Sequence, residues 1–336
     1  MKAESRKTKK AKERPLSLDT PYYMTELGQA FLGDSLVLLK EIPDCSINLI
    51  LTSPPFALTR KKEYGNKSAS EYVDWFLQFA SDFKRILTAD GSLVLDLGSA
   101  YLPGFPIRSI YQFELLIRLV NDYGFFLAQD FYHYNPSRLP TPAEWVTVRR
   151  VRVKDSVNTV WWLSVSEFPK ADNRQVLKPY SESMRQLLRN GYKPKLRPSG
   201  HDISDKFQKD NRGAIPPNLL ELANTESNSA YLRRCREAGI KPHPARFPEG
   251  LADFFIRFLT CEGDLVLDPF AGSNTTGCVA ERLRRRWIAI EINQTYLDGS
   301  VYRFQEVNDL FPVVRRTDVT THQSATIREG RTRNRR

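Results

Sequence analysis

The sequence predicts an α/β fold in which helices cover both faces of one doubly wound, mostly parallel sheet. Short apolar runs alternate along the chain with longer amphipathic segments, which is the pattern of strands joined by helical crossovers. Two of the runs end in turns of unusual composition, one rich in proline and one rich in small residues. Since open α/β sheets bind ligands at the carboxyl ends of their strands, these two turns are the first candidates for a functional site.

The expected elements follow the same alternation from the first apolar run to the last. The long segment over residues 70–87 is amphipathic, and the run over residues 91–97 alternates in the manner of a strand. The remaining strands are expected at residues 29–34, 47–52, 125–134, 157–164 and 286–291. The remaining helices are expected at residues 35–41, 110–123 and 275–284.

The first turn, Ser53-Pro54-Pro55-Phe56, directly follows the apolar run over residues 47–52. Two prolines remove two backbone donors and fix two φ angles, so the strand must end there. The Ser53 hydroxyl and the Pro54 carbonyl can accept the two hydrogens of an amino group, while Phe56 can stack on the attached ring. Because Ser-Pro-Pro is also a common loop sequence, the turn alone leaves a purely structural role open.

The second turn lies within residues 263–277, which predict a strand, a tight turn of small residues and the start of a helix. Such a turn lets a ligand approach the backbone and offers the amides of a helix N-terminus. It lacks the three spaced glycines of the dinucleotide motif, so NAD is not the natural ligand. Glu291 ends the next strand, 23 residues after Asp268, near the spacing at which a strand-end carboxylate binds ribose hydroxyls. An acid at the tip of a strand can also be simply solvated.

Together the two turns resemble those of the DNA amino-methyltransferases, which use S-adenosyl-L-methionine. Residues 268–273 (Asp-Pro-Phe-Ala-Gly-Ser) resemble the cofactor loop of these enzymes, and residues 53–56 resemble their catalytic tetrapeptide. The tetrapeptide comes first, which is the order of the circularly permuted group. Within that group the chain is most similar to the PvuII-type cytosine-N4 modification methylases, over roughly residues 28–306. Further matching stretches are residues 63–66, 71–76, 151–155, 158–162, 197–203, 215–220 and 243–248.

The resemblance implies a permuted S-adenosylmethionine-dependent methyltransferase sheet that carries a DNA-recognition insert. It assigns catalysis to Ser53, Pro54, Pro55 and Phe56, and it implies no metal site. Asn274 stands where many relatives carry glycine, but asparagine tolerates left-handed backbone almost as well. The cofactor-binding residues that it implies are Asp34, Pro244, Phe247, Asp268, Phe270, Ala271, Gly272, Ser273, Asn274, Thr275 and Glu291.

Some of these positions have structural alternatives. Asp34 is the adenine-side acid of the family pattern, and this role is favoured over the alternative that it serves only as the N-cap of the helix over residues 35–41. The segment at His243-Pro244 and Phe247, which lines the methionine end of the cofactor in the family, could instead be packing. Three aromatic residues before Asn135 could line a base pocket or belong to the core, namely Tyr132, His133 and Tyr134.

The implied chemistry is transfer of a methyl group to an exocyclic amino nitrogen, whose lone pair is delocalised into the ring. Hydrogen bonds from both amino hydrogens, to Ser53 and to the Pro54 carbonyl, would favour a tetrahedral nitrogen, so positioning and electrostatics supply the effect. The base must leave the duplex to reach such a pocket. Methylation of cytosine C5 is set aside, because it needs a thiolate that usually follows a proline, and no cysteine here does so.

Composition agrees with an enzyme of the cytoplasm. The 336 residues contain no run of 18 apolar residues, and the basic N-terminus is not followed by an apolar segment, so neither a spanning helix nor a secretory signal is expected. The four cysteines show no paired spacing and are expected to be free thiols, with no zinc site and no disulfide framework.

The net charge of +11 is concentrated in three segments of the chain. Residues 1–14 and 315–336 carry +5 each, and residues 138–212 combine 16 basic with 8 acidic side chains. Basic surface with interspersed aromatic and amide side chains is typical of DNA-binding regions, although a run of charge can also be only a solvated face. The predicted organisation is a flexible basic tail (1–27), a catalytic half (28–164), a target-recognition insert (165–242), a cofactor half (243–310) and a second flexible basic tail (311–336).

The sequence therefore predicts a site-specific methyltransferase that acts on the N4 atom of cytosine in double-stranded DNA. It would be the modification enzyme of a restriction-modification system, with CAGCTG as a candidate site that a cognate endonuclease shares without contacting this protein. No membrane and no obligate protein partner are expected. Two alternatives stay open: an adenine-N6 methyltransferase, in which the tetrapeptide more often begins with Asp or Asn, and a non-catalytic DNA-binding protein.

Overall fold

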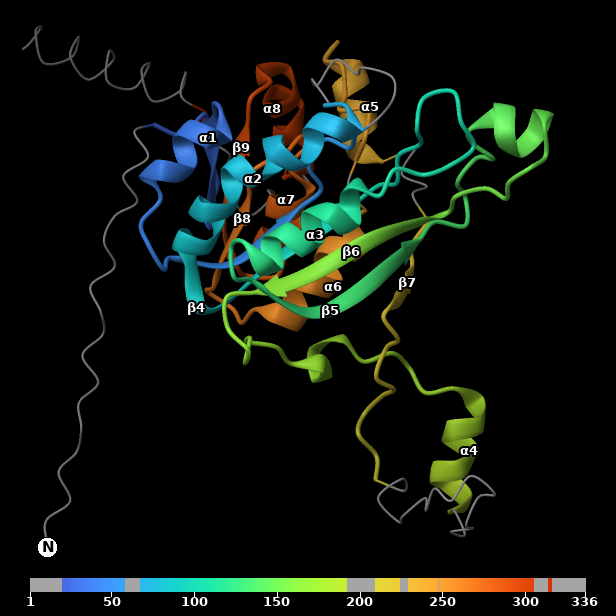
Figure 1. The fold of residues 1–336 in the computed structure, drawn as a ribbon. Coiled ribbons are helices and arrows are strands. Elements are labelled where there is room, and N and C mark those ends of the chain that lie inside the picture. The colour runs from blue at the N-terminus through green and yellow to red at the C-terminus, as the bar shows by residue number, and fades with distance from the viewer. Residues whose placement is uncertain are drawn as a thin grey trace, which may run out of the picture.

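The computed structural model describes residues 20–57, 67–191, 209–223, 229–246, 248–304 and 314–315. These residues form one ten-stranded sheet in the order β10-β1-β2-β9-β8-β3-β4-β6-β5-β7 (Figure 1). Its strands are β1 (Tyr23–Met24), β2 (Gly28–Leu32), β3 (Ile47–Thr52), β4 (Leu87–Leu97), β5 (Phe126–Tyr134), β6 (Val157–Ser164), β7 (Leu219–Glu221), β8 (Leu265–Asp268), β9 (Arg286–Glu291) and β10 (Val314–Arg315).

The centre of the sheet is parallel. Parallel pairings run continuously from β2 through β9, β8 and β3 to β4, whereas β6 is antiparallel to both of its neighbours, β4 and β5. Consequently β5 runs in the same direction as β3 and β4, and the carboxyl ends of all these parallel strands meet at one edge. The predicted doubly wound, mostly parallel sheet is confirmed.

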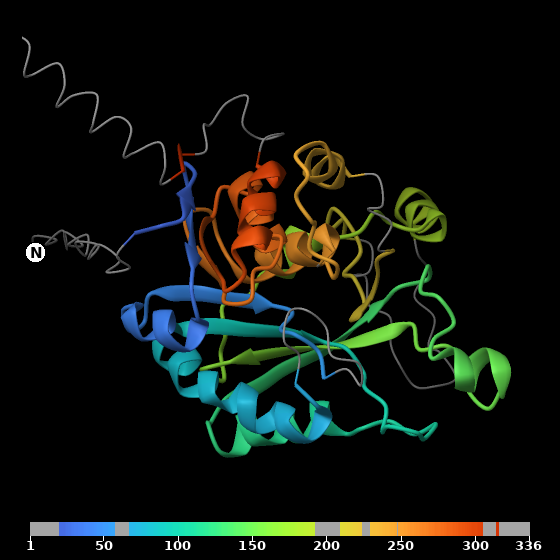
Figure 2. The ribbon, with the colours of Figure 1, turned by 90° about the horizontal axis from the view of Figure 1, so that it is seen from above.

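Helices cover both faces of the sheet (Figure 2). One face is covered by α2 and α3, and the other is covered by α6, α7 and α8. No helix within the described residues is long and apolar enough to cross a membrane. The helices are α1 (Ser35–Leu38), α2 (Ala69–Ile86), α3 (Tyr111–Asn121), α4 (Glu182–Asn190), α5 (Ala230–Glu237), α6 (Glu249–Leu259), α7 (Thr275–Arg282) and α8 (Gln294–Ser300).

Strand periodicity divides the core into two layers. In β3, Ile50 packs into the layer under α2 and α3, while Leu49 and Leu51 pack into the layer under α6 and α7. Successive side chains of a strand point to opposite faces, so an apolar run without polar breaks is the signature of a strand covered on both sides. β3 therefore lies in the middle of the molecule, between the two layers of helices. The proline-rich turn directly follows its carboxyl end.

The elements expected from the sequence are present, with ends that differ by a few residues. The expectation of wholly flexible tails was wrong in two places, since residues 23–24 form β1 and residues 314–315 form β10, paired with each other at the sheet edge. Tyr23 is buried, and its hydroxyl lies 2.8 Å from the side chains of both Ser300 and Asn274. Two-residue strands show no periodicity, so the sequence offered no sign of them. Of the predicted tails, residues 1–19, 311–313 and 316–336 lie outside the described residues.

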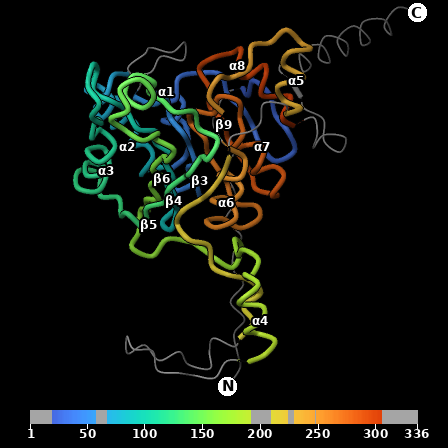
Figure 3. The backbone as a smooth tube through the Cα atoms, turned by 90° about the vertical axis from the view of Figure 1, so that its right-hand side faces the viewer, coloured from blue at the N-terminus to red at the C-terminus, as the bar shows by residue number. Residues whose placement is uncertain are grey.

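The predicted insert is partly integrated into the sheet. β7 extends the sheet beside β5, and α5 packs near α8, whereas α4 projects well away from the sheet (Figure 3). Residues 192–208, which belong to the basic segment 138–212 that was expected to contact DNA, lie outside the described residues.

Candidate active site

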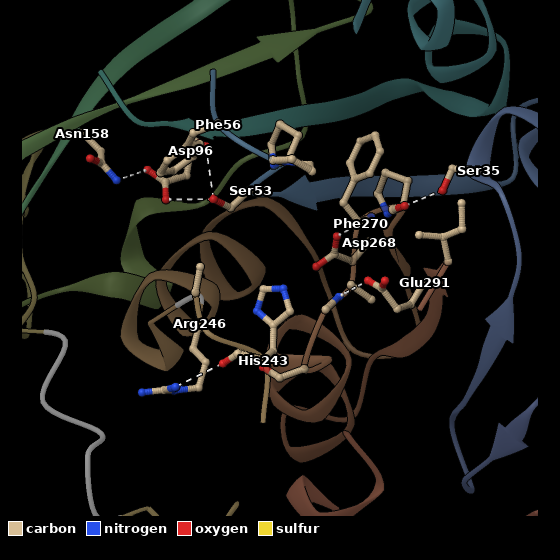
Figure 4. Close-up of a pocket in the computed structure, with 18 of the residues that line it drawn as sticks. Ser35, Ser53, Phe56, Asp96, Asn158, His243, Arg246, Asp268, Phe270 and Glu291 are labelled. Atoms are coloured by element: carbon tan, nitrogen blue, oxygen red, sulfur yellow. Dashed lines mark hydrogen bonds between the residues drawn. The ribbon is translucent and has the colours of Figure 1, made fainter. Parts of the chain in front are cut away.

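A cavity of about 530 Å³ lies at the carboxyl ends of β3, β4, β8 and β9. Figure 4 shows Ser53, Asp96 and Asn158 toward one end of it and Asp268, Phe270 and Glu291 toward the other. The two turns singled out from the sequence, about 200 residues apart, therefore form two walls of the same cavity.

The proline-rich turn presents its hydroxyl and its ring to the cavity. The Ser53 hydroxyl donates to Asp96, with 3.3 Å to the backbone oxygen and 3.3 Å to Oδ2. The Phe56 ring lies against Gly98, where an added Cβ would sit only 2.3 Å from the ring. Only a glycine at that position leaves room for the ring, and all four predicted catalytic residues line the cavity.

Asp96 is a site residue that sequence reasoning missed. Its carboxylate is buried, and it accepts a hydrogen bond of 3.2 Å from Asn158 Nδ2. Burial raises the pKa of Asp96, and the nearby His133, Asn158 and Ser53 partly oppose that rise. A signal was available, because Asp96 interrupts the otherwise apolar end of the strand over residues 91–97.

Asn158 and Arg138, which the sequence analysis also missed, extend this wall. Asn158 is buried on β6, and its Oδ1 accepts a hydrogen bond of 2.9 Å from Arg138 Nη1. His133, which was expected either here or in the core, is buried and lines the cavity. Its Nε2 lies 3.2 Å from the Leu222 carbonyl oxygen, and its Nδ1 has no hydrogen-bond partner among the described residues. Tyr132 and Tyr134 are not part of the lining.

On the opposite wall, Asp268 holds the small-residue turn in place. Its carboxylate accepts hydrogen bonds from Thr52 Oγ1 at 2.7 Å, from Thr276 Oγ1 at 2.8 Å and from the Phe270 amide at 3.1 Å. Burial raises the pKa of Asp268 from its ordinary 3.8 to about 6. Because both oxygens already serve the turn and the neighbouring elements, the main role of Asp268 is to fix the loop.

Glu291 connects the tip of β9 to the same turn. Oε2 accepts a hydrogen bond of 2.7 Å from the Gly272 amide, and Oε1 accepts one of 2.9 Å from the Asn293 amide. Burial raises the pKa of Glu291. Gly272 has a φ of 52°, and an added Cβ would lie 3.2 Å from the His243 ring, so the turn approaches His243 as closely as a glycine allows.

Phe270 contributes an aromatic surface beside this turn. Its ring centroid lies 5.7 Å from that of Trp75 and 5.1 Å from that of Phe79, both on α2. All three rings line the cavity, together with Ala271 and Ser273 of the turn. Burial lowers the pKa of His243, on the facing segment, to about 4, so that ring is neutral near pH 7.

Asp34 combines the two roles that the sequence left open. It accepts a hydrogen bond of 2.9 Å from the Leu36 amide as the N-cap of α1, and it also lines the cavity. The structure does not bring three other predicted cofactor residues to the cavity wall, namely Pro244, Asn274 and Thr275. Phe247 lies outside the described residues.

Asn274 shows why a residue of the turn can be essential to it without facing a ligand. Its φ of 53° and ψ of 46° confirm the left-handed backbone expected for this position. The side chain is fully buried, accepts a hydrogen bond of 3.1 Å from the Gly277 amide as the cap of α7 and donates one of 2.8 Å to Tyr23. Asn274 therefore stabilises the turn from behind.

Comparison with known proteins places this geometry in a family. A family model described as DNA methylase (N6_N4_Mtase) matches residues 47–302. The chain is 57% identical over 291 residues to the type II methyltransferase M.PvuII of Proteus hauseri, covering 86% of this chain and 87% of that protein. It is 26% identical to the DNA adenine methyltransferase YhdJ of Escherichia coli (strain K12), covering 87% of this chain and 83% of that protein.

A solved structure shows the same relationship. The PvuII DNA methyltransferase, described as cytosine-N4-specific, aligns with a TM-score of 0.70 and 51% identity, over 84% of this chain and 88% of that one. The family match spans both walls of the cavity, from the catalytic turn to the tip of β9 and beyond. The chain therefore belongs to the N6_N4_Mtase family of DNA methylases.

Proposed function

We propose that this protein transfers a methyl group from S-adenosyl-L-methionine to the exocyclic N4 atom of a cytosine in double-stranded DNA. The observation that carries the proposal is the Ser53 hydroxyl at the cavity wall. Its hydrogen is directed to Asp96, at 3.3 Å, so its lone pairs are left to accept a hydrogen from an amino group in the cavity.

The opposite wall fits S-adenosylmethionine. Gly272 leaves open the space that a Cβ would fill, and a buried carboxylate, Glu291, stands beside it with acceptor capacity beyond its two backbone bonds. Glu291 would accept from the ribose hydroxyls, Asp34 would face the adenine side, and Phe270 would offer an apolar face to the ring. When bound, the cofactor supplies an electrophilic methyl group on a sulfonium sulfur.

The residues of the first wall would prepare the nucleophile. The Ser53 hydroxyl and the Pro54 carbonyl would accept the two amino hydrogens, which favours a tetrahedral nitrogen and exposes its lone pair. Phe56, fixed against Gly98, would stack on the base and hold the nitrogen in line.

The same hydrogen bonds supply a path for the proton that the amino group must lose. A proton accepted by Ser53 can be passed on to Asp96, whose burial raises its pKa and makes it a better proton acceptor than an exposed carboxylate. No covalent intermediate between the protein and the base is needed.

Similarity supports the finer assignment. M.PvuII, at 57% identity, is named a type II methyltransferase, and the aligned PvuII structure is described as cytosine-N4-specific. We therefore propose that this protein is the modification enzyme of a restriction-modification system in the cytoplasm, with CAGCTG as the candidate site. It would act without an obligate protein partner, and a cognate endonuclease would share only the site.

The test is direct identification of the product. Purified protein is incubated with tritiated S-adenosylmethionine and duplexes that either contain CAGCTG or carry a scrambled version of it, and the DNA is digested to nucleosides for mass spectrometry. N4-methyldeoxycytidine from the CAGCTG duplex alone is the expected result. Detection of N6-methyldeoxyadenosine would identify the protein as an adenine-N6 methyltransferase instead. Cofactor binding without any methylated product would favour a non-catalytic DNA-binding protein.

A further inference from the structure

Beyond Ser53 and Asp96, the same wall continues through Asn158 and Arg138, two side chains to which the mechanism proposed above gives no role. Asp96 Oδ1 accepts a hydrogen bond of 3.2 Å from Asn158 Nδ2, and Asn158 Oδ1 accepts one of 2.9 Å from Arg138 Nη1. All of these residues line the cavity. The hydrogen bonds therefore form an uninterrupted line from the hydroxyl of the catalytic turn to a guanidinium.

The two ends of this hydrogen-bonded line offer different groups to a ligand. It starts with hydrogen-bond acceptors at Ser53 and Asp96, and it ends with the donors of Arg138. Among the described residues only Nη1 of that guanidinium has a hydrogen-bond partner, which leaves Nε and Nη2 to donate to whatever enters the cavity. Arginine carries five N–H donors and remains charged, so an entering group that offers an acceptor is strongly preferred to one that does not.

Arg138 is held at this position by the backbone around it. Its amide donates to the Asn135 carbonyl at 3.2 Å, which closes a tight turn at the carboxyl end of β5. Lys154 Nζ donates to the carbonyl oxygens of both Pro136 and Arg138, at 3.1 and 3.3 Å. The turn is therefore anchored on both sides, and the guanidinium is not on a freely moving loop.

We propose that this wall reads the Watson–Crick edge of the extruded base, and that Arg138 distinguishes cytosine from adenine by donating to the cytosine 2-carbonyl. The inference rests on the function proposed above. With its amino group at Ser53, cytosine presents a donor, then a ring-nitrogen acceptor, then a carbonyl acceptor along this edge. Adenine presents the same amino group and ring nitrogen but a C–H group in the third position.

The third position therefore carries the discrimination. For cytosine, Arg138 gains a charge-assisted hydrogen bond, whereas for adenine its donors would be desolvated without an acceptor. A hydrogen bond to a charged group contributes enough to change kcat/KM by about 10- to 100-fold.

The test uses a base analogue that lacks the 2-carbonyl. One duplex carries cytosine at the target position, and the other carries a 2-aminopyridine C-nucleoside, which keeps the amino group and the adjacent ring nitrogen but has C–H in place of the 2-carbonyl. Wild-type enzyme is expected to lose about 10- to 100-fold in kcat/KM on the analogue. Arg138→Gln is expected to be slower than wild type on cytosine, yet to treat the two duplexes equally to within about twofold.

Two controls keep the result unambiguous. Arg149→Gln removes the same charge from the segment between β5 and β6 but not from the cavity lining, so it should retain the wild-type discrimination. Arg138→Lys keeps the charge without the forked donors and should show intermediate discrimination, and calorimetry of cofactor binding should show both Arg138 variants to be intact in the cofactor half.

Equal rates of wild-type enzyme on the two duplexes would overturn the inference, whether or not the variants fold. The inference would also be overturned if kcat/KM of Arg138→Gln fell by the same factor as that of wild type when the analogue replaced cytosine. Product identification separates this failure from that of the proposed function. If the product is N4-methyldeoxycytidine but discrimination between the two duplexes does not depend on Arg138, only this inference is wrong. If wild-type enzyme produces N6-methyldeoxyadenosine, both the inference and the proposed function are wrong.

Discussion

The two walls of the cavity are built in different ways. The cofactor wall comes from β8, β9 and the turn between them, and its carboxylates are held by hydrogen bonds of 2.7 to 3.1 Å. The base wall comes from the ends of β3, β4 and β5 and the start of β6, and the bonds around Asp96 measure 3.2 to 3.3 Å.

The difference indicates that the cofactor wall is preorganised, whereas the base wall takes its final geometry when substrate binds. Asp268 and Glu291 already accept hydrogen bonds from backbone amides and hydroxyls, so the cofactor turn is held in shape before any ligand binds. The longer hydrogen bonds of Ser53 and Asp96 are typical of catalytic groups that tighten only when substrate arrives. Substitutions in the cofactor wall should therefore change binding and stability, and those in the base wall should change the rate.

The largest effect is expected at the Ser53–Asp96 pair. Ser53→Ala and Asp96→Asn should each lower kcat by about 10²–10³-fold, because each removes a group aligned with the reacting nitrogen. The double variant should lose little more than either single one, since the two residues act as a unit. Single-turnover assays with tritiated cofactor measure the rates, and calorimetry should show unchanged cofactor affinity. A wild-type rate in Ser53→Ala would show that Ser53 does not act at the reacting nitrogen.

The pH dependence of stability should distinguish Asp268 from an ordinary surface carboxylate. Burial raises its pKa from 3.8 to about 6, so between these pH values the native state binds more protons than the unfolded chain. Stability conferred by the protonated form is therefore lost as pH rises through this window, by roughly 2–3 kcal/mol at most. Asp268→Asn should flatten the curve of unfolding free energy against pH, measured in urea. Identical slopes for the two proteins would contradict the assignment.

Cofactor affinity should report on Glu291. Glu291→Ala removes the acceptor of the Gly272 and Asn293 amides together with the proposed ribose contact, so the dissociation constant for S-adenosylmethionine should rise about 10- to 100-fold. Glu237→Ala on the exposed side of α5 is the matched control and should bind normally. Unchanged affinity in Glu291→Ala, measured by calorimetry, would show that the ribose lies elsewhere.

The smallest effect concerns the backbone of the cofactor turn. Asn274→Gly and Asn274→Ala both remove the cap of α7 and the bond to Tyr23, but only glycine adopts a φ of 53° without strain. The alanine variant should therefore be about 1 kcal/mol less stable than the glycine variant in urea unfolding. Equal stabilities would mean that the turn changes conformation when the side chain is removed.

Much of the cofactor wall was predictable from the sequence. The turn, the strand before it and the acid at the tip of β9 all lie within residues 263–291, and their geometry follows from short-range rules about small residues, helix starts and strand ends. Even the left-handed backbone of Asn274 was expected. The sequence did not show that Asn274, Thr275 and Pro244 stay away from the cavity, because burial depends on what packs behind the turn.

In the base wall, too, the local structure was predictable from the sequence and the long-range contacts were not. The sequence by itself determined the catalytic turn, since two prolines end a buried strand wherever they occur. Only the tertiary structure decided that Asp96, Asn158 and Arg138 complete the wall. They meet because β4, β6 and β5 pair side by side in one particular register, in which Asp96 lies opposite Val160 and His133 lies opposite Asn158. A shift of one residue would turn every side chain of a strand to the other face, and register is set by packing across the whole sheet.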